Sequence, residues 1–150
     1  MSNLLLKNIF FHTLEKSIKT YRQMARSEFN KAGYDITMDQ SLVLKAISDY
    51  PKYSQQEIAE MVFKDNASLT RIIDLIIKKK YLKRQTHTQD RRRFALSVTD
   101  AGVDLLRALD PVAKSNRAKA LKGINGQQKE QLTLLLNTII NNCQSYKTSK

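Results

Sequence analysis

Hydrophobic residues recur every three or four positions along the start of the chain. Side chains with this spacing share one face of a helix, so the pattern predicts an amphipathic helix. Gly33 then provides a C-terminal stop, because glycine readily adopts the left-handed conformation that ends many helices. The positions on the predicted apolar face are Leu6, Phe10, Leu14, Ile18, Tyr21, Ala25 and Phe29.

Two further helical patterns occupy the last third of the chain. The first covers about residues 100–122, and Pro111 inside it is expected to kink or break the helix just before that position. The second begins after Asn125, which forms a predicted capping box with Gln128. The apolar face predicted for this last helix consists of Leu132, Leu135, Leu136, Ile139, Ile140, Cys143 and Tyr146.

The middle of the chain contains three shorter helical patterns, each with a start signal. Thr37 caps the first, and Ser54 opens a capping box at the start of the second. Asp65 and Asn66 both offer a cap for the third, which is predicted to cover residues 67–80. These caps place three short helices one after another. The last two of them would form a helix-turn-helix.

After the third short helix the hydrophobic period changes from that of a helix to that of a strand. Phe94, Leu96 and Val98 alternate with less apolar residues, which predicts a half-buried strand. Residues 82–87 can pair with it across a turn in residues 88–91. The order of elements therefore predicts a mainly α fold with a small β-hairpin wing. In such a winged helix-turn-helix, the second helix of the helix-turn-helix lies in the major groove of DNA.

The charge of the chain points to the same partner. Lysine and arginine number 26 against 14 acidic residues, for a net charge of +12. Residues 78–93 alone contain eight basic residues and one acidic residue. A basic run by itself is equally typical of a solvated surface, but this one lies at the hairpin beside the helix-turn-helix. The hairpin offers no bare apolar helix face opposite the charges, so membrane binding is disfavoured.

Several other classes of protein are disfavoured by the sequence. Apolar runs of at most three residues predict no membrane span, and the N-terminus shows no signal peptide. Together with a single cysteine, this favours a cytoplasmic location. His12 and His87, the two histidines, lie far apart, and zinc-ligand spacing, a glycine-rich phosphate loop and a nucleophile elbow are missing. We therefore expect no enzyme activity, no cofactor and no metal site.

Four segments resemble the MarR family of bacterial transcriptional regulators: residues 54–60, 67–74, 79–84 and 90–102. The most specific of them begins Asp90-Arg-Arg-Arg and continues through a strand into Thr-Asp-Ala-Gly. The resemblance covers essentially the whole chain and implies one MarR-type domain of residues 1–150. Within it, residues 37–100 would form the winged helix-turn-helix lobe.

The resemblance also implies a homodimer in which N- and C-terminal dimerisation helices, residues 1–33 and 112–146, intertwine. Such a dimer would bind a palindromic operator in double-stranded DNA and release it in response to a small aromatic effector. An effector pocket is expected between Tyr21, residues 42–47 and residues 105–109. The alternatives are a non-specific architectural or RNA-binding basic protein, and a protein-interaction module without affinity for DNA.

The resemblance assigns DNA contacts to both the helix-turn-helix and the wing. Arg71 is the strongest candidate for reading a base, because a guanidinium can bind guanine O6 and N7 together. Its alternatives are a phosphate contact or an ion pair with Asp74. Arg92 corresponds to the arginine that the family inserts into the minor groove. The full set of expected DNA-binding residues is Ser54, Gln55, Asn66, Ser68, Thr70, Arg71, Arg91, Arg92 and Arg93.

Two residues are expected to be structural. Asp74 lies within an apolar stretch and is predicted to pair with a basic residue of the wing. Cys143 continues the apolar face of the last helix and is predicted to be a buried thiol without a redox role.

Overall fold

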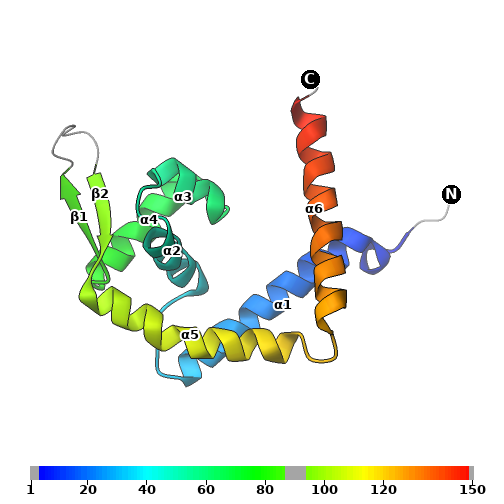
Figure 1. The fold of residues 1–150 in the computed structure, drawn as a ribbon, viewed down its shortest axis with the longest axis horizontal. Coiled ribbons are helices and arrows are strands. Elements are labelled where there is room, and N and C mark those ends of the chain that lie inside the picture. The colour runs from blue at the N-terminus through cyan, green and yellow to red at the C-terminus, as the bar shows by residue number, and fades with distance from the viewer. Residues whose placement is uncertain (1–3, 87–93, 149–150) are drawn as a thin grey trace. The chain divides into compact units, whose positions relative to one another are not determined.

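The computed structural model describes residues 4–86 and 94–148. It confirms a mainly helical fold with one antiparallel β-hairpin (Figure 1). A short 3-10 helix, η1, precedes the first α-helix. The elements are η1 (Leu6–Asn8), α1 (Phe10–Lys31), α2 (Met38–Asp49), α3 (Gln55–Met61), α4 (Asn66–Lys78), β1 (Leu82–Thr86), β2 (Phe94–Val98), α5 (Asp100–Ala120) and α6 (Gly126–Thr148).

The predicted helix starts are confirmed by their capping contacts. The backbone N–H of Gln40 donates to Thr37 Oγ1 over 3.0 Å, and that of Gln128 donates to Asn125 Oδ1 over 2.8 Å. Ser54 closes the predicted capping box with Glu57 at the start of α3. Each contact satisfies a backbone donor that a helix N-terminus otherwise leaves without a partner. Short sequence signals therefore determine where these helices begin.

Several boundaries differ from the predictions, and α4 ends at Lys78 rather than at residue 80. The first helix begins at Phe10 rather than Leu6, since the residues before it form the separate η1 turn. Of the kink or break predicted at Pro111, the break is wrong, because α5 continues through this residue. Proline removes a single helical hydrogen bond. The buried side chains of Leu105 and Leu109 hold the preceding turns of α5 against the core.

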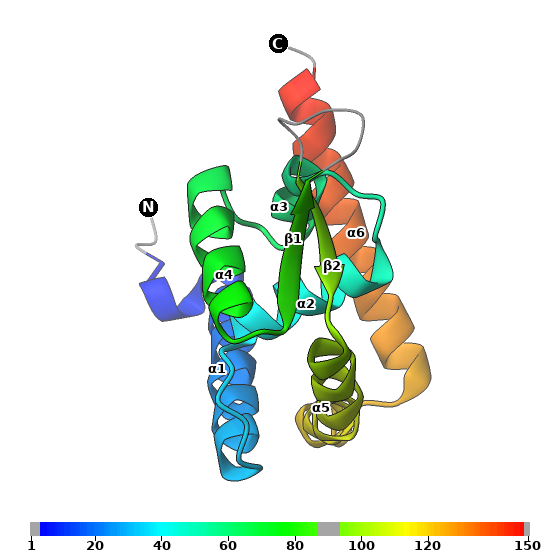
Figure 2. The ribbon, with the colours of Figure 1, turned by 90° about the vertical axis from the view of Figure 1, so that its left-hand side faces the viewer.

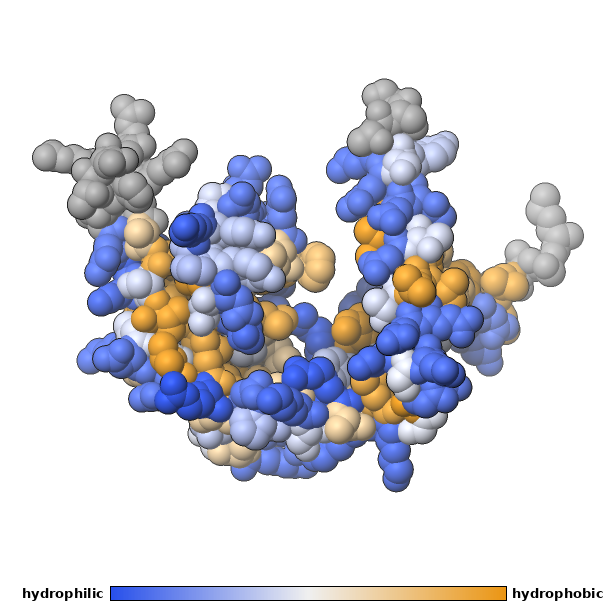
Figure 3. Space-filling view, viewed as in Figure 1, coloured by the Kyte–Doolittle hydropathy of each residue, from blue (hydrophilic) through white to orange (hydrophobic). Residues whose placement is uncertain are grey.

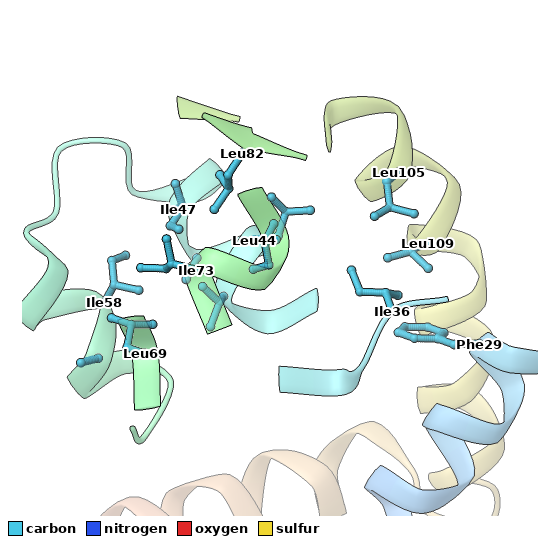
Figure 4. Close-up of a cluster of buried hydrophobic side chains, with 14 residues drawn as sticks. Phe29, Ile36, Leu44, Ile47, Ile58, Leu69, Ile73, Leu82, Leu105 and Leu109 are labelled. Carbon is cyan, nitrogen blue, oxygen red and sulfur yellow. The ribbon is translucent and has the colours of Figure 1, made fainter. Parts of the chain in front are cut away.

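The chain forms two compact units, residues 1–116 and 117–150. The first unit has a hydrophobic core to which every helix from α1 to α5 and strand β1 contribute (Figure 4). Full burial of an aliphatic side chain stabilises a fold by about 1.5–3 kcal/mol, so these residues hold the lobe together. The most deeply buried aliphatic side chains are Val43, Leu44, Leu69, Ile73, Ile76 and Leu82.

The hairpin lies beside α4 and leads directly into α5 (Figure 2). Leu82 pairs with Val98 and Arg84 pairs with Leu96 in the antiparallel register. Leu82 is buried, and Leu96 and Val98 pack against the core as the alternating pattern predicted. One face of the wing thus extends the core of the lobe.

The turn from β2 into α5 requires a glycine. Thr99 Oγ1 donates to the Lys80 carbonyl over 2.7 Å and accepts from the Gly102 N–H over 3.1 Å. A Cβ atom on Gly102 would lie 2.3 Å from the Tyr81 carbonyl oxygen, closer than any normal contact. Thr99 and Gly102 are therefore needed for the close packing of α5 on the wing.

The second unit has a different character. Hydrophobic side chains lie on the outside of α6 (Figure 3), and no residue between Gly126 and Lys147 is buried. Leu132, Leu135 and Ile140 are 47%, 55% and 49% exposed. Cys143 is exposed as well, so the prediction of a buried thiol is wrong for the single chain. The reason is that this unit supplies no second layer to cover the apolar face of α6.

Apolar side chains are also exposed at the start of the chain. Leu4, Leu5, Leu6, Phe10 and Phe11 are each 57–67% exposed.

Within residues 4–86 and 94–148, no helix has both the length and the apolar character that crossing a membrane requires.

Candidate nucleic-acid interface

Helices α3 and α4 form a helix-turn-helix with a well-defined start for its second helix. The Ser68 N–H donates to Asp65 Oδ1 over 2.7 Å, so Asp65 rather than Asn66 is the N-cap of α4. Hydrogen bonds from Ser68 hold the pKa of the Asp65 carboxyl below its ordinary value. In the turn before it, Phe63 adopts the left-handed conformation with φ of 61°. These local contacts fix the direction in which α4 leaves the turn.

Helix α4 has one buried and one exposed face. Leu69, Ile73 and Ile76 are 0% exposed and pack into the core. Arg71 is exposed on the other side, and Asn66 is exposed as the first residue of the helix. Because an α-helix repeats every 3.6 residues, this arrangement leaves the outer face of the first turns of α4 open to a ligand.

Arg71 lies along this outer face. Its Nη2 atom is 3.3 Å from Ser68 Oγ, one turn earlier. The alternative pair between Arg71 and Asp74 is not formed. Asp74 instead accepts from Nη2 of Arg84 on β1 over 3.1 Å, which confirms the predicted pair with a basic residue of the wing. The charge of Arg71 therefore remains at the surface of the helix.

Gln55 and Thr70 contact each other across the two helices. Gln55 Nε2 donates to Thr70 Oγ1 over 2.9 Å, and the Thr70 hydroxyl donates to the Asn66 carbonyl over 2.8 Å. Sequence reasoning placed both side chains at the DNA and missed this contact, because the two residues are fifteen positions apart. The bond links the start of α3 to the outer face of α4.

The remaining predicted site residues fall into two groups. Ser54 is exposed, and its hydroxyl oxygen accepts from the Glu57 N–H over 3.1 Å, which leaves its own O–H free to donate outward. Arg91, Arg92 and Arg93 lie outside the described residues, between the two strands of the wing.

The three lysines at the end of α4 are not equivalent. Lys78 and Lys80 are exposed, whereas Lys79 is half-buried. Lys79 Nζ donates to the Asp35 carbonyl over 2.8 Å and to Gln40 Oε1 over 3.1 Å. Two internal hydrogen bonds hold its ammonium group, so Lys79 is a structural residue of the lobe. The sequence gives no signal for this difference, because all three lysines are consecutive.

A pocket of about 980 Å³ lies beside the helix-turn-helix. The end of α2, the start of α3 and the wing form its walls, with Arg84 among the lining residues. Tyr50 and Tyr53 on its rim stack with ring centroids 4.7 Å apart. This pocket shares only Ile47 with the region in which an effector pocket was predicted. Among the described residues, no group of three or more His, Cys, Asp or Glu side chains is placed to hold a metal ion.

Comparisons with known proteins agree with this geometry. The model of the MarR family matches residues 36–94, which contain α2, α3, α4 and β1. The HTH-type transcriptional regulator SarZ from Staphylococcus epidermidis is 29% identical over 107 residues, covering 71% of this chain and 68% of SarZ.

Two solved structures show the same fold. One, from a study of how 6-hydroxynicotinic acid regulates DNA binding by BpsR of Bordetella bronchiseptica, has a TM-score of 0.78 at 20% identity and covers 87% of this chain and 92% of that one. The other is a mutant of MarR from E. coli complexed with operator DNA. Its TM-score is 0.77 at 19% identity, and the match covers 85% of this chain and 90% of that one.

Proposed function

Because this chain belongs to the MarR family of DNA-binding transcriptional regulators, we propose that it acts as a homodimer that binds a palindromic operator in double-stranded DNA. The observation that carries this proposal is the pair of unlike faces on α4. One face is sealed in the core, and the other presents Arg71 to the surroundings. A recognition helix needs this combination, because a rigid lobe must hold the reading side chains outward.

The proposed contacts divide into three kinds. Arg71 binds a base edge in the major groove, and Asn66, Ser68 and Thr70 lie beside it on the first turns of α4. The N–H groups and side chains at the start of α3, with Ser54 and Gln55, face backbone phosphates.

The wing provides the third kind of contact. Arg92 enters the minor groove, flanked by Arg91 and Arg93. An arginine in a narrow minor groove responds to groove width, so this contact favours A·T-rich flanks.

We propose that the second copy binds through the terminal helices, residues 1–33 and 112–146. Both carry apolar side chains that the chain itself leaves exposed. Two lobes held at a fixed separation each contact one half-site. Doubling the contacts raises affinity and makes the target a palindrome, since two-fold symmetry in the protein matches two-fold symmetry in the operator.

We further propose that an aromatic anion controls DNA binding from the pocket beside α3. DNA binding by BpsR, a structural neighbour, is regulated by 6-hydroxynicotinic acid. The stacked Tyr50 and Tyr53 offer an aromatic surface, and Lys52 adds positive charge to the same pocket. The effector must bind the DNA-incompetent state more tightly, with a coupling of about 1–3 kcal/mol. Operator DNA must then weaken effector binding by the same factor, which calorimetry with and without operator measures directly.

Selection of bound sequences from random duplexes tests the main proposal. The expected product is one palindrome, and competition should show a preference over bulk DNA of at least about 10³-fold. Equal binding to all duplexes would favour a non-specific architectural protein, and preference for RNA would favour an RNA-binding protein. A protein-interaction module would show no salt-dependent affinity for DNA at all.

A further inference from the structure

The first turn of α2 contains a group of polar contacts that join parts of the chain far apart in sequence. Asp39 Oδ1 accepts from Nη2 of Arg22, which belongs to α1. Its other oxygen, Oδ2, is 3.1 Å from Nζ of Lys64, in the turn between α3 and α4. One carboxylate therefore binds both the first helix and the residue that immediately precedes the N-cap of α4.

The next residue of α2 holds the other end of α4. Gln40 is 5% exposed, and its Oε1 accepts from Nζ of Lys79 over 3.1 Å and from the Thr37 N–H over 3.3 Å. Lys79 is the C-cap of α4. Consecutive residues of α2 thus hold the recognition helix from both of its ends.

The electrostatics favour a charged Asp39. Partial burial by itself raises the pKa of its carboxyl, but hydrogen bonds and positive charge from Lys64 and Arg22 outweigh this effect. The pKa is consequently held below its ordinary value of 3.8. The side chains of Arg22, Asp39 and Lys64 are each only 32–38% exposed, so solvent screens them less than a pair on the open surface.

Arg22 is well placed to fix the direction of α1. The C-terminal part of α1 is held in the core by Phe29, which is 3% exposed. Arg22 lies seven residues earlier on the same helix, about 10 Å along its axis at 1.5 Å per residue. Ala25, which is 1% exposed, is buried on the same face of α1 between Arg22 and Phe29. The contact with Asp39 adds a further fixed point nearer the N-terminus of α1 and so restricts tilting of the helix.

We propose that Asp39 is a positioning residue that fixes the angle between α1 and the recognition helix α4, and thereby sets the half-site spacing that the protein accepts. The inference rests on the proposed homodimer, in which α1 belongs to the dimer interface and α4 to the DNA. If the two are joined rigidly, the two recognition helices keep one separation. If the joint loosens, several separations become accessible without any change in the side chains that contact DNA.

Binding of the full-length chain to palindromic duplexes that differ only in half-site spacing tests this inference. The spacing varies in steps of one base pair, and the wild type should prefer one value. For Asp39→Asn we expect the ratio of affinities between the best and the next spacing to fall at least fivefold. Affinity for a duplex with a single half-site should change by less than twofold relative to the control described next.

Asp49→Asn is the matched control. It removes the same charge from the same helix, but Asp49 pairs with Lys45 four residues away on α2 and joins no other segment. A general gain in DNA affinity from the lost negative charge appears in both variants, whereas a broader spacing profile appears only in Asp39→Asn. Arg22→Gln provides a second route to the same loss, because it leaves Lys64 on Asp39, and thermal unfolding checks that every variant is folded.

Each outcome decides between the proposals. Broad profiles for Asp39→Asn and Arg22→Gln, with a sharp one for Asp49→Asn, support the positioning role. If the wild type, Asp39→Asn and Arg22→Gln all keep a sharp spacing profile, the positioning role is overturned and the proposed function stays intact. A wild type that binds every spacing equally contradicts binding of a palindrome by a fixed dimer, and the positioning role falls with it.

Discussion

Helices α4 and α6 are both amphipathic, yet the chain treats their apolar faces differently. In α4 the residues Leu69, Ile73 and Ile76 are 0% exposed. In α6 the corresponding positions, such as Leu132 and Leu135, are about half exposed. The lobe around α4 supplies its own second layer from α2, α3 and the wing. The unit that contains α6 supplies no such layer. The apolar spacing in the sequence therefore predicts the helix and its apolar face, but not what covers that face.

The largest expected loss of stability comes from truncating a buried side chain of α4. Ile73→Ala should lower the free energy of unfolding by about 2–5 kcal/mol, because it removes a fully buried side chain and leaves a cavity. The loss should be the same at all protein concentrations. Leu135→Ala on α6 is the matched change on the open face. It should leave the lobe folded and lower the unfolding midpoint by an amount that depends on protein concentration, as expected for a weakened dimer.

Chemical denaturation at two protein concentrations, hundredfold apart, separates these effects. If Ile73→Ala and Leu135→Ala lower stability alike and independently of concentration, α6 is stabilised within one chain and the comparison fails.

A pair of glycines extends the comparison to the backbone. Gly102→Ala should destabilise the lobe by about 1–3 kcal/mol, since the new Cβ meets a backbone carbonyl that cannot move freely. Gly126→Ala at the start of α6 meets nothing within 4 Å and should be neutral or slightly stabilising. Thermal unfolding of both variants measures the difference. Equal midpoints would show that α5 is not packed against the wing as described.

Within the lobe, the outer face of α4 can be compared with its C-terminal end. Arg71→Ala should cost about 1–3 kcal/mol on the selected operator and relax specificity at one base pair. Lys78→Ala should weaken all sequences alike and lower the log–log salt slope by about 0.9 if it contacts a phosphate. Lys79 is not suited to this test, because its ammonium group is held by internal hydrogen bonds. An unchanged specificity ratio for Arg71→Ala would show that the base-reading surface lies elsewhere.

The wing adds a third variant to the same titrations. Arg92→Ala should reduce affinity more on A·T-rich flanks than on G·C-rich ones, because groove width changes with sequence. An equal loss on both flanks would mean that the wing contacts phosphates only.

The smallest effect concerns pH. A carboxyl whose pKa is lowered on folding stabilises the protein above its ordinary pKa, and this stability is lost as the pH falls through the folded-state value. Asp39→Asn should therefore be less stable than the wild type near neutral pH by about 1 kcal/mol or less. The difference should shrink as the pH falls below 3.8. Urea unfolding at several pH values measures it, and a difference that does not depend on pH would contradict the role of the charge.

Local sequence signals determined much of the fold. Capping residues such as Thr37, Ser54 and Asn125 mark helix starts because each satisfies a backbone donor a few residues away. The change of hydrophobic period at the wing is also a local signal, and it predicted the hairpin. A break at Pro111 was wrongly predicted because Leu109 before it and Val112 after it both pack against the core, a tertiary effect that the local pattern does not show.

The candidate site was less predictable where contacts join distant segments. Lys79 binds Asp35 and Gln40, and Gln55 binds Thr70, although nothing in the local pattern distinguishes these residues from neighbours that face solvent. The pair between Asp74 and Arg84 was predictable in kind, because a charged residue within an apolar stretch needs a partner. Long-range polar contacts depend on how whole helices and strands pack together. Many residues determine that packing jointly, so no short sequence signal reveals the contacts.

In the proposed dimer, a second copy of the chain covers the apolar faces that one copy leaves open. Sedimentation equilibrium of the full-length chain at micromolar concentration, with and without the selected operator duplex, measures whether this dimer forms. We expect a species of twice the 17.3 kDa chain mass without operator, and a complex of two chains with one duplex when operator is present. A stable 17.3 kDa species that still binds one palindrome tightly would contradict it.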